Sequence, residues 1–131
     1  MLDPHEEGVV RAFFIRERRQ QFLTRLANPK TRKKILRHLA HFYDFDPRYA
    51  YLIPAAQQDL ESIYRLLRGK GAPHTCHCIS ETSDFDGKIM NLRDGLVEAD
   101  EIIDGVILSC IPGRLAYYSG ENAGRRYILE R

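Results

Sequence analysis

The chain of 131 residues lacks any long apolar run, and no stretch approaches the roughly 18 apolar residues of a membrane-spanning helix. Its first ten residues, MLDPHEEGVV, are acidic and lack the basic and apolar regions of a secretion signal. It has only three cysteines, an odd number that disfavours a disulfide framework. These absences predict a cytoplasmic protein with no membrane partner.

Familiar ligand motifs are also lacking. The stretch GKGAP at 69–73 follows a predicted helix and does not match the phosphate-binding loop, which needs a longer spacing and a closing Lys-Ser or Lys-Thr. Neither a helix-turn-helix nor an RNA-recognition fingerprint is present, and there is no internal repeat or low-complexity segment. The sequence therefore predicts no cofactor and resembles no family with a known activity.

The composition that remains is that of a globular protein, with 44% hydrophobic and 29% charged residues. This length favours one domain over residues 1–131. Apolar residues with helical spacing predict helices over 5–27, 29–43 and 55–68, and a further helix from Asn91 to Gly105. Strands are predicted over 74–80, 106–111, 114–119 and 126–130, with a possible short strand at 87–90.

The order of these elements is ααα-β(β)-α-βββ. Helices that precede strands, rather than alternate with them, favour an α+β fold. We therefore expect N-terminal helices, at about 5–68, packed on a small, mainly antiparallel sheet formed within about 74–130.

Charge is unevenly distributed although the net charge is only +2. Residues 1–50 carry 11 Lys and Arg against 6 Asp and Glu, and residues 51–131 carry 9 against 12. No acidic residue occurs between Lys30 and Tyr43. Basic residues at i, i+3, i+4, i+7, i+8 and i+11 of the helix 29–43 form a stripe opposite its apolar face: Lys30, Lys33, Lys34, Arg37, His38 and His41.

This stripe admits three interpretations. A solvated helix face is common, but such faces usually mix charges of both signs. The stripe predicts instead either an anionic partner or pairing with carboxylates from the acidic half of the chain. Arg48 lies among nearby aromatic residues, and such a combination can bind single-stranded nucleic acid, although we expect most of these aromatics to be core. They are Phe42, Tyr43, Phe45, Tyr49 and Tyr51.

The stretch PHTCHCISETSDFDG at 73–87 is the second candidate site. In a strand, His74, Cys76 and Cys78 point to one face, and Cys110 on the strand 106–111 could join them if the two strands are neighbours. That set predicts a metal or reactive-thiol site only as a minor alternative, because free cysteines usually behave as small buried hydrophobes. Glu81, Asp84, Asp86 and Lys88 could hold a divalent cation, but Ser, Asp and Gly here are also typical of a turn.

The leading functional prediction is a non-catalytic binding module that contacts nucleic acid, or otherwise an acidic protein surface, through the helix 29–43. One alternative is a metal- or thiol-dependent enzyme that uses residues 74–88. Another is a purely structural or protein-protein interaction domain. A homodimer is also possible, because the polar interruption at 16–21 and the apolar strand 106–111 could each offer an unpaired face or edge.

Overall fold

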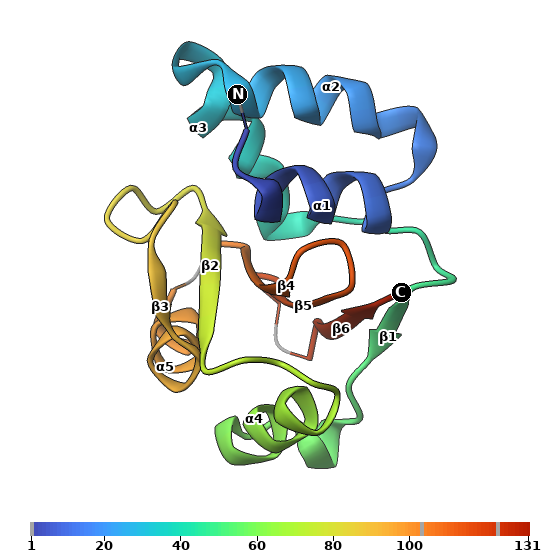
Figure 1. The fold of residues 1–131 in the computed structure, drawn as a ribbon, viewed down its shortest axis with the longest axis vertical. Coiled ribbons are helices and arrows are strands. Elements are labelled where there is room, and N and C mark those ends of the chain that lie inside the picture. The colour runs from blue at the N-terminus through green and yellow to red at the C-terminus, as the bar shows by residue number, and fades with distance from the viewer. Residues whose placement is uncertain (1, 103, 123) are drawn as a thin grey trace.

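The computed structural model describes residues 2–102, 104–122 and 124–131, arranged in three layers (Figure 1). One face of a central sheet is covered by α1 (Pro4–Phe13), α2 (Arg16–Ala27) and α3 (Pro29–Leu36). The opposite face is covered by α4 (Leu60–Gly69) and α5 (Leu92–Glu101). Two 3-10 turns, η1 (Arg37–His41) and η2 (Ala55–Gln57), connect the layers. This architecture confirms the α+β prediction.

The described strands form one six-stranded antiparallel sheet in the order β1-β6-β5-β4-β2-β3. Their bounds are β1 (Ala50–Leu52), β2 (Thr75–Ser80), β3 (Ile89–Asn91), β4 (Val106–Ile111), β5 (Leu115–Ser119) and β6 (Arg126–Glu130). The strands predicted from apolar runs and alternation are thus all present. β4 pairs with β2 and β5 and lies inside the sheet, so this strand offers no free edge for a dimer.

Short polar side chains set where the helices begin. Asp3 accepts a hydrogen bond from the His5 amide ahead of α1, and Asn28 accepts one from the Lys30 amide ahead of α3. Proline occupies the first position of both helices, where its missing N–H has no intrahelical partner to lose. The predicted start of the basic helix at Asn28-Pro29 is therefore confirmed.

All four predicted helices are shorter in the structure than in the prediction. The helix expected over 55–68 begins only at Leu60, after η2, and the helix expected from Asn91 to Gly105 ends at Glu101. The helix expected over 5–27 is broken between Phe13 and Arg16, because the backbone there pairs with residues 44–46. The Ile15 amide donates to the Asp44 carbonyl at 2.8 Å, and the Asp46 amide donates to the Phe13 carbonyl at 2.7 Å. The helix expected over 29–43 likewise leaves α-helical geometry after Leu36 and continues as η1.

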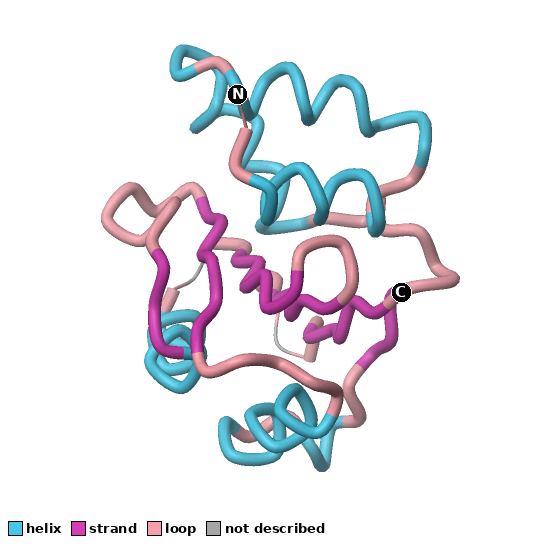
Figure 2. Tube along the Cα trace, viewed as in Figure 1, coloured by secondary structure: helices cyan, strands magenta, loops and turns pink. Residues whose placement is uncertain are grey.

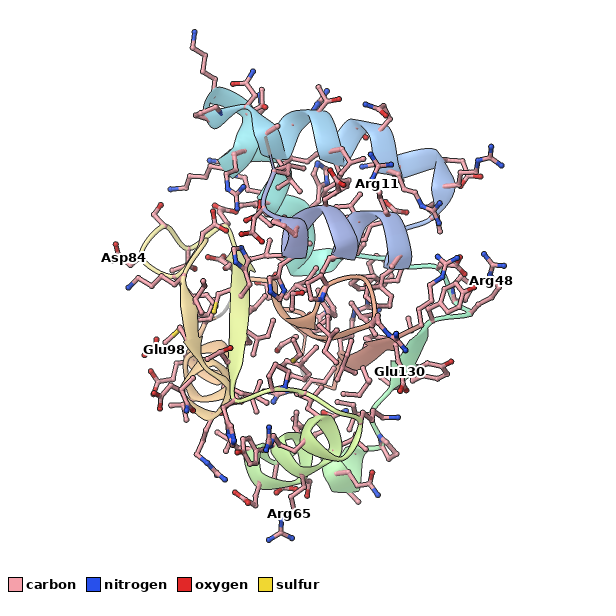
Figure 3. All side chains as sticks on the ribbon, in the orientation of Figure 1. Arg11, Arg48, Arg65, Asp84, Glu98 and Glu130 are labelled. Carbon is pink, nitrogen blue, oxygen red and sulfur yellow. The ribbon has the colours of Figure 1, made fainter. Side chains whose placement is uncertain are left out.

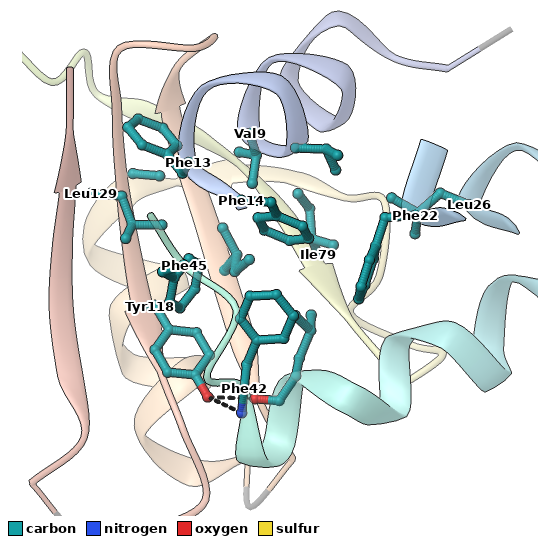
Figure 4. Packing of buried hydrophobic residues seen from close by; sticks show 14 of the residues in the cluster. Val9, Phe13, Phe14, Phe22, Leu26, Phe42, Phe45, Ile79, Tyr118 and Leu129 are labelled. Atoms are coloured by element: carbon teal, nitrogen blue, oxygen red, sulfur yellow. Dashed lines mark hydrogen bonds between the residues drawn. The ribbon is translucent and has the colours of Figure 1, made fainter. Parts of the chain in front are cut away.

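The core between α1–α3 and the sheet is rich in aromatic residues (Figure 4). Phe14 packs edge-on against Phe22 with ring centroids 4.8 Å apart, and Phe42 packs against Phe45 at 4.7 Å. Phe42 and Phe45 are thus core residues as expected, whereas Tyr43 and Tyr51 are 67% and 51% exposed and Tyr49 is half-buried. The aromatic cluster predicted from the sequence is divided between core and surface.

One buried hydroxyl connects this core to η1. Tyr118 of β5 donates a hydrogen bond to the Leu39 carbonyl at 2.5 Å and accepts one from the Phe42 amide at 3.3 Å (Figure 4). Gly105 lies against the same turn, and a Cβ at this position would be 1.9 Å from the Leu39 carbonyl oxygen. η1 therefore approaches the sheet so closely that only glycine fits before β4.

The second core, between the sheet and helices α4 and α5, contains the cysteines. Cys76 and Cys78 of β2 point to this face, while His77 and Ile79 point towards α1, as the alternation of the strand predicts. β2 is thus buried on both sides. No helix in the described ranges is long and apolar enough to cross a membrane.

Candidate functional site

The predicted basic stripe is divided by the structure into free and paired residues. Lys30, Lys33 and Lys34 are exposed on α3, and no carboxylate of a described residue lies within 4.0 Å of their ammonium groups. Arg37 continues the same side of the helix and contacts Glu81 at 3.3 Å, with its side chain 62% exposed. We call Lys30, Lys33, Lys34 and Arg37 the basic surface.

The other predicted basic residues are not part of this surface, and their side chains contact other groups of the protein. His41 pairs with Glu121, and the His38 ring packs edge-on against Phe22 with centroids 6.3 Å apart. Arg48 donates to both carboxylate oxygens of Asp46, which lowers the pKa of Asp46 to about 2. Pairing with the protein's own carboxylates thus accounts for part of the stripe but not for the three lysines.

The cysteines occupy a buried layer with no polar ligand among them. Cys76, Cys78 and Cys110 are free and buried, whereas His74 is exposed and contacts Arg68 at 3.3 Å. A hydrogen bond with Cys76, together with burial, raises the pKa of Cys78, and burial raises the pKa of Cys110 to about 12. The thiolate is the form that binds metals and attacks electrophiles, so Cys78 and Cys110, whose pKa values are raised, are suited to packing rather than chemistry.

The carboxylates of the 81–86 turn point to different partners. Glu81 faces Arg37, and Asp86 accepts two hydrogen bonds from Arg32, while Asp84 lies at the outer tip of the loop (Figure 3). Across residues 2–102, 104–122 and 124–131, no group of three or more His, Cys, Asp or Glu is arranged to hold a metal ion. The turn therefore links the sheet to the helical layer.

A charge cluster lies where this loop meets the helices, formed by buried Glu6 and by Arg32 and Asp86, which are half-buried. We call it the buried charge cluster. Figure 2 shows the loop between β2 and β3 rising towards the helical layer, and Arg32 of α3 joins the two. Arg32 donates to Glu6 at 2.7 and 2.8 Å and to Asp86 at 2.7 and 3.0 Å, and its remaining N–H group reaches the Leu26 carbonyl at 3.3 Å. All donors of this guanidinium are used within the protein.

Glu6 has a further partner in His77 of β2, whose Nε2 lies 2.9 Å from Glu6 Oε2. Burial alone would raise the pKa of Glu6, but the hydrogen bonds from His77 and Arg32 outweigh burial and lower it to about 2. Glu6 is therefore ionised at neutral pH and accepts hydrogen bonds only. The hydrogen bonds to Glu6 also raise the pKa of Arg32, so the pair stays charged.

A second histidine packs on the first. The His5 ring stacks on His77 with centroids 5.4 Å apart, and its Nδ1 lies 2.8 Å from Ser109 Oγ. Burial and the neighbouring His77 lower the pKa of His5. A serine beside a histidine suggests nucleophilic catalysis, but Ser109 is completely buried inside β4, and no substrate can reach its hydroxyl. The contact between His5 and Ser109 is therefore a structural hydrogen bond of the core.

The buried charge cluster was missed in the sequence, although a signal was present. Glu6 precedes Val9, Val10 and Phe13 on the apolar stripe of α1, and Arg32 occupies the equivalent position before Ile35 and Leu36 of α3 and Leu39 of η1. A charged residue inside an apolar stripe needs a buried partner, because an unpaired buried charge is strongly destabilising. Two such residues of opposite sign predict a pair.

No family model, curated protein or solved structure matches this chain.

Proposed function

We propose that this protein is a non-catalytic binding module that contacts the phosphates of nucleic acid through the basic surface. The observation that supports the proposal is the trio of exposed lysines on α3, none of which has a carboxylate partner among the described residues. Some other exposed arginines have one, such as Arg65 and Arg93, which both contact Glu61. Others have none among the described residues, such as Arg16, Arg25 and Arg114. The three lysines differ from these because they lie together on one side of a short helix.

This arrangement lowers the stability of an already short helix. Lys30 and Lys34 are four residues apart, as are Lys33 and Arg37, and each like-charged pair costs roughly 0.2–0.5 kcal/mol. α3 has only eight residues and little intrinsic stability to offset this cost. A bound polyanion would offset this repulsion, because its negative groups would pair with the lysine ammonium groups.

The spacing of the basic surface also suits a phosphate chain. Lys30 and Arg37 are seven residues apart, which corresponds to a rise of about 10 Å along a helix. Phosphates of one strand of a duplex follow each other at about 3.4 Å along the axis. A helix lying along the duplex axis would therefore place the basic surface over about three phosphate-to-phosphate steps. The Arg37–Glu81 pair is exposed, and such pairs are worth at most about 1 kcal/mol, so Arg37 can exchange Glu81 for a phosphate.

The test compares two double variants with the same change in net charge. K33Q/K34Q removes half of the basic surface, and R65Q/R114Q removes two exposed arginines elsewhere, Arg65 lying on α4 at the far pole of the molecule (Figure 3). Fluorescence anisotropy with labelled DNA and RNA oligonucleotides at low salt should show weakened binding for K33Q/K34Q only.

Three results would overturn the proposal. Equal loss in the two variants would mean that net charge, and not the basic surface, attracts the oligonucleotide. No measurable binding of the unmodified protein to any oligonucleotide would exclude nucleic acid. Binding to a polyglutamate peptide that exceeds binding to nucleic acid would identify an acidic protein surface as the partner.

A further inference from the structure

A cavity of about 470 Å³ opens beside the buried charge cluster. The N-terminal segment, the corner between α2 and α3 and the end of the β2–β3 loop surround it. Part of its wall is apolar and formed by Leu2, Leu26 and Pro29. Asp3 and His77 contribute polar atoms to the same wall.

The charges around this cavity favour a cation over an anion. Asp3, Glu6 and Asp86 line it, and Arg32 is the one Lys or Arg in its lining. Since every N–H of Arg32 already has an acceptor within the protein, this arginine has no donor left for a bound anion. The carboxylates therefore leave the cavity with an excess of negative charge.

His77 supplies an independent indication of a missing group. Its side chain is 5% exposed, and Nδ1 has no hydrogen-bond partner within the described part of the chain. Its Nε2 must donate to the Glu6 carboxylate, so in the neutral ring Nδ1 is an acceptor without a donor. The closest charged atom is Asp3 Oδ1 at 3.7 Å, too far for a hydrogen bond and itself an acceptor.

We propose that this cavity binds a primary ammonium group carried on a short apolar stem. The ammonium donates one N–H to His77 Nδ1, which has no other donor, and another to the Asp3 carboxylate, which already accepts the His5 amide. The stem lies against Leu2, Leu26 and Pro29. A free alkylamine and the side chain of a lysine on a partner protein share this chemistry, and the site does not depend on the basic surface.

The test is a two-dimensional NMR titration of the full chain with n-butylammonium, 1-butanol and butyrate. We expect shifts centred on His77 and Asp3 and an affinity for n-butylammonium about tenfold higher than for 1-butanol, the ratio typical of one charge-assisted hydrogen bond. Butyrate should cause no saturable shift. Equal affinity for the amine and the alcohol, or tighter binding of butyrate, would overturn the proposal.

Asp3→Asn is a suitable variant because asparagine caps a helix as well as aspartate does, so α1 keeps its start while the negative charge is lost. It should weaken n-butylammonium about tenfold and leave 1-butanol unchanged, whereas K33Q/K34Q should bind the amine as the unmodified protein does. Nitrogen shifts of His77 provide a second readout, and a proton on Nδ1 of the free protein at neutral pH would contradict the site. Tighter binding of Nα-acetyl-lysine methylamide than of n-butylammonium would identify a partner's lysine as the source.

Discussion

Replacing Glu6 by glutamine tests the structural role of the buried charge cluster. The variant keeps the shape of the side chain but leaves Arg32 with one carboxylate instead of two, and it turns an amide N–H towards the donors of Arg32 and His77. Removing one partner of a fully buried ion pair costs about 3–5 kcal/mol, and the loss here should lie at or below the lower end of that range because Arg32 is 22% exposed and keeps Asp86 as a partner. The pKa gives an independent figure, since a carboxyl that falls from 4.5 to about 2 on folding contributes roughly 3 kcal/mol at neutral pH.

The sign of the pH dependence follows from the same lowered pKa. The folded state holds Glu6 ionised, so its contribution is complete above pH 4.5 and is lost as the pH falls towards 2. E6Q should therefore differ from the unmodified protein most at neutral pH and least near pH 2. Asp46, whose pKa Arg48 also lowers to about 2, leaves some acid sensitivity in both proteins.

Urea unfolding followed by circular dichroism at several pH values measures both effects. Glu7→Gln is the matched control, because Glu7 is the next residue and its exposed pair with Arg11, at 3.6 Å, is expected to contribute less than about 1 kcal/mol. The reasoning would be refuted if E6Q lowered the free energy of unfolding by less than about 1 kcal/mol at neutral pH. It would also be refuted if plots of this free energy against pH stayed parallel for E6Q and the unmodified protein down to pH 2.

Three further outcomes test the packing. Gly105→Ala should lower the free energy of unfolding by at least about 1–3 kcal/mol, because its Cβ meets the Leu39 backbone, and an unchanged urea midpoint would contradict that contact. Tyr118→Phe should cost about 1–3 kcal/mol by leaving buried backbone groups of Leu39 and Phe42 without a partner, as measured by thermal unfolding. The three buried cysteines should react with a thiol reagent only after denaturation, and fast labelling of the native protein at mildly alkaline pH would show a reactive thiol.

The parts of the fold that the sequence predicts are those set by local chemistry. Asn28 and Pro29 begin a helix wherever they occur before a helical pattern, and the alternation in β2 assigns His77 and Cys78 to opposite faces without knowledge of the neighbouring strands. The apolar run of β4 likewise indicated a strand buried inside the sheet. Periodicity of two or 3.6 residues is sufficient for each of these predictions.

The parts that the sequence did not predict depend on contacts between distant segments. α1 and α2 separate because Phe14 pairs with Phe45, and β1 exists because it lies beside β6; neither partner is visible from the local pattern. The basic stripe was read from α3 alone, so the carboxylates that face Arg37 and His41 from Glu81 and Glu121 could not be assigned.

The dependence of nucleic-acid binding on salt tests the proposed function most directly. The logarithm of the association constant is measured between about 50 and 200 mM salt for the unmodified protein and for K30Q/K33Q/K34Q. Each phosphate contact contributes about 0.7 to the magnitude of the slope of log K against log salt on a single strand and about 0.9 on a duplex. Removing three lysines should therefore reduce the magnitude of this slope by about two to three. Weaker binding with an unchanged slope, or an unchanged affinity and slope, would contradict phosphate contact through the basic surface.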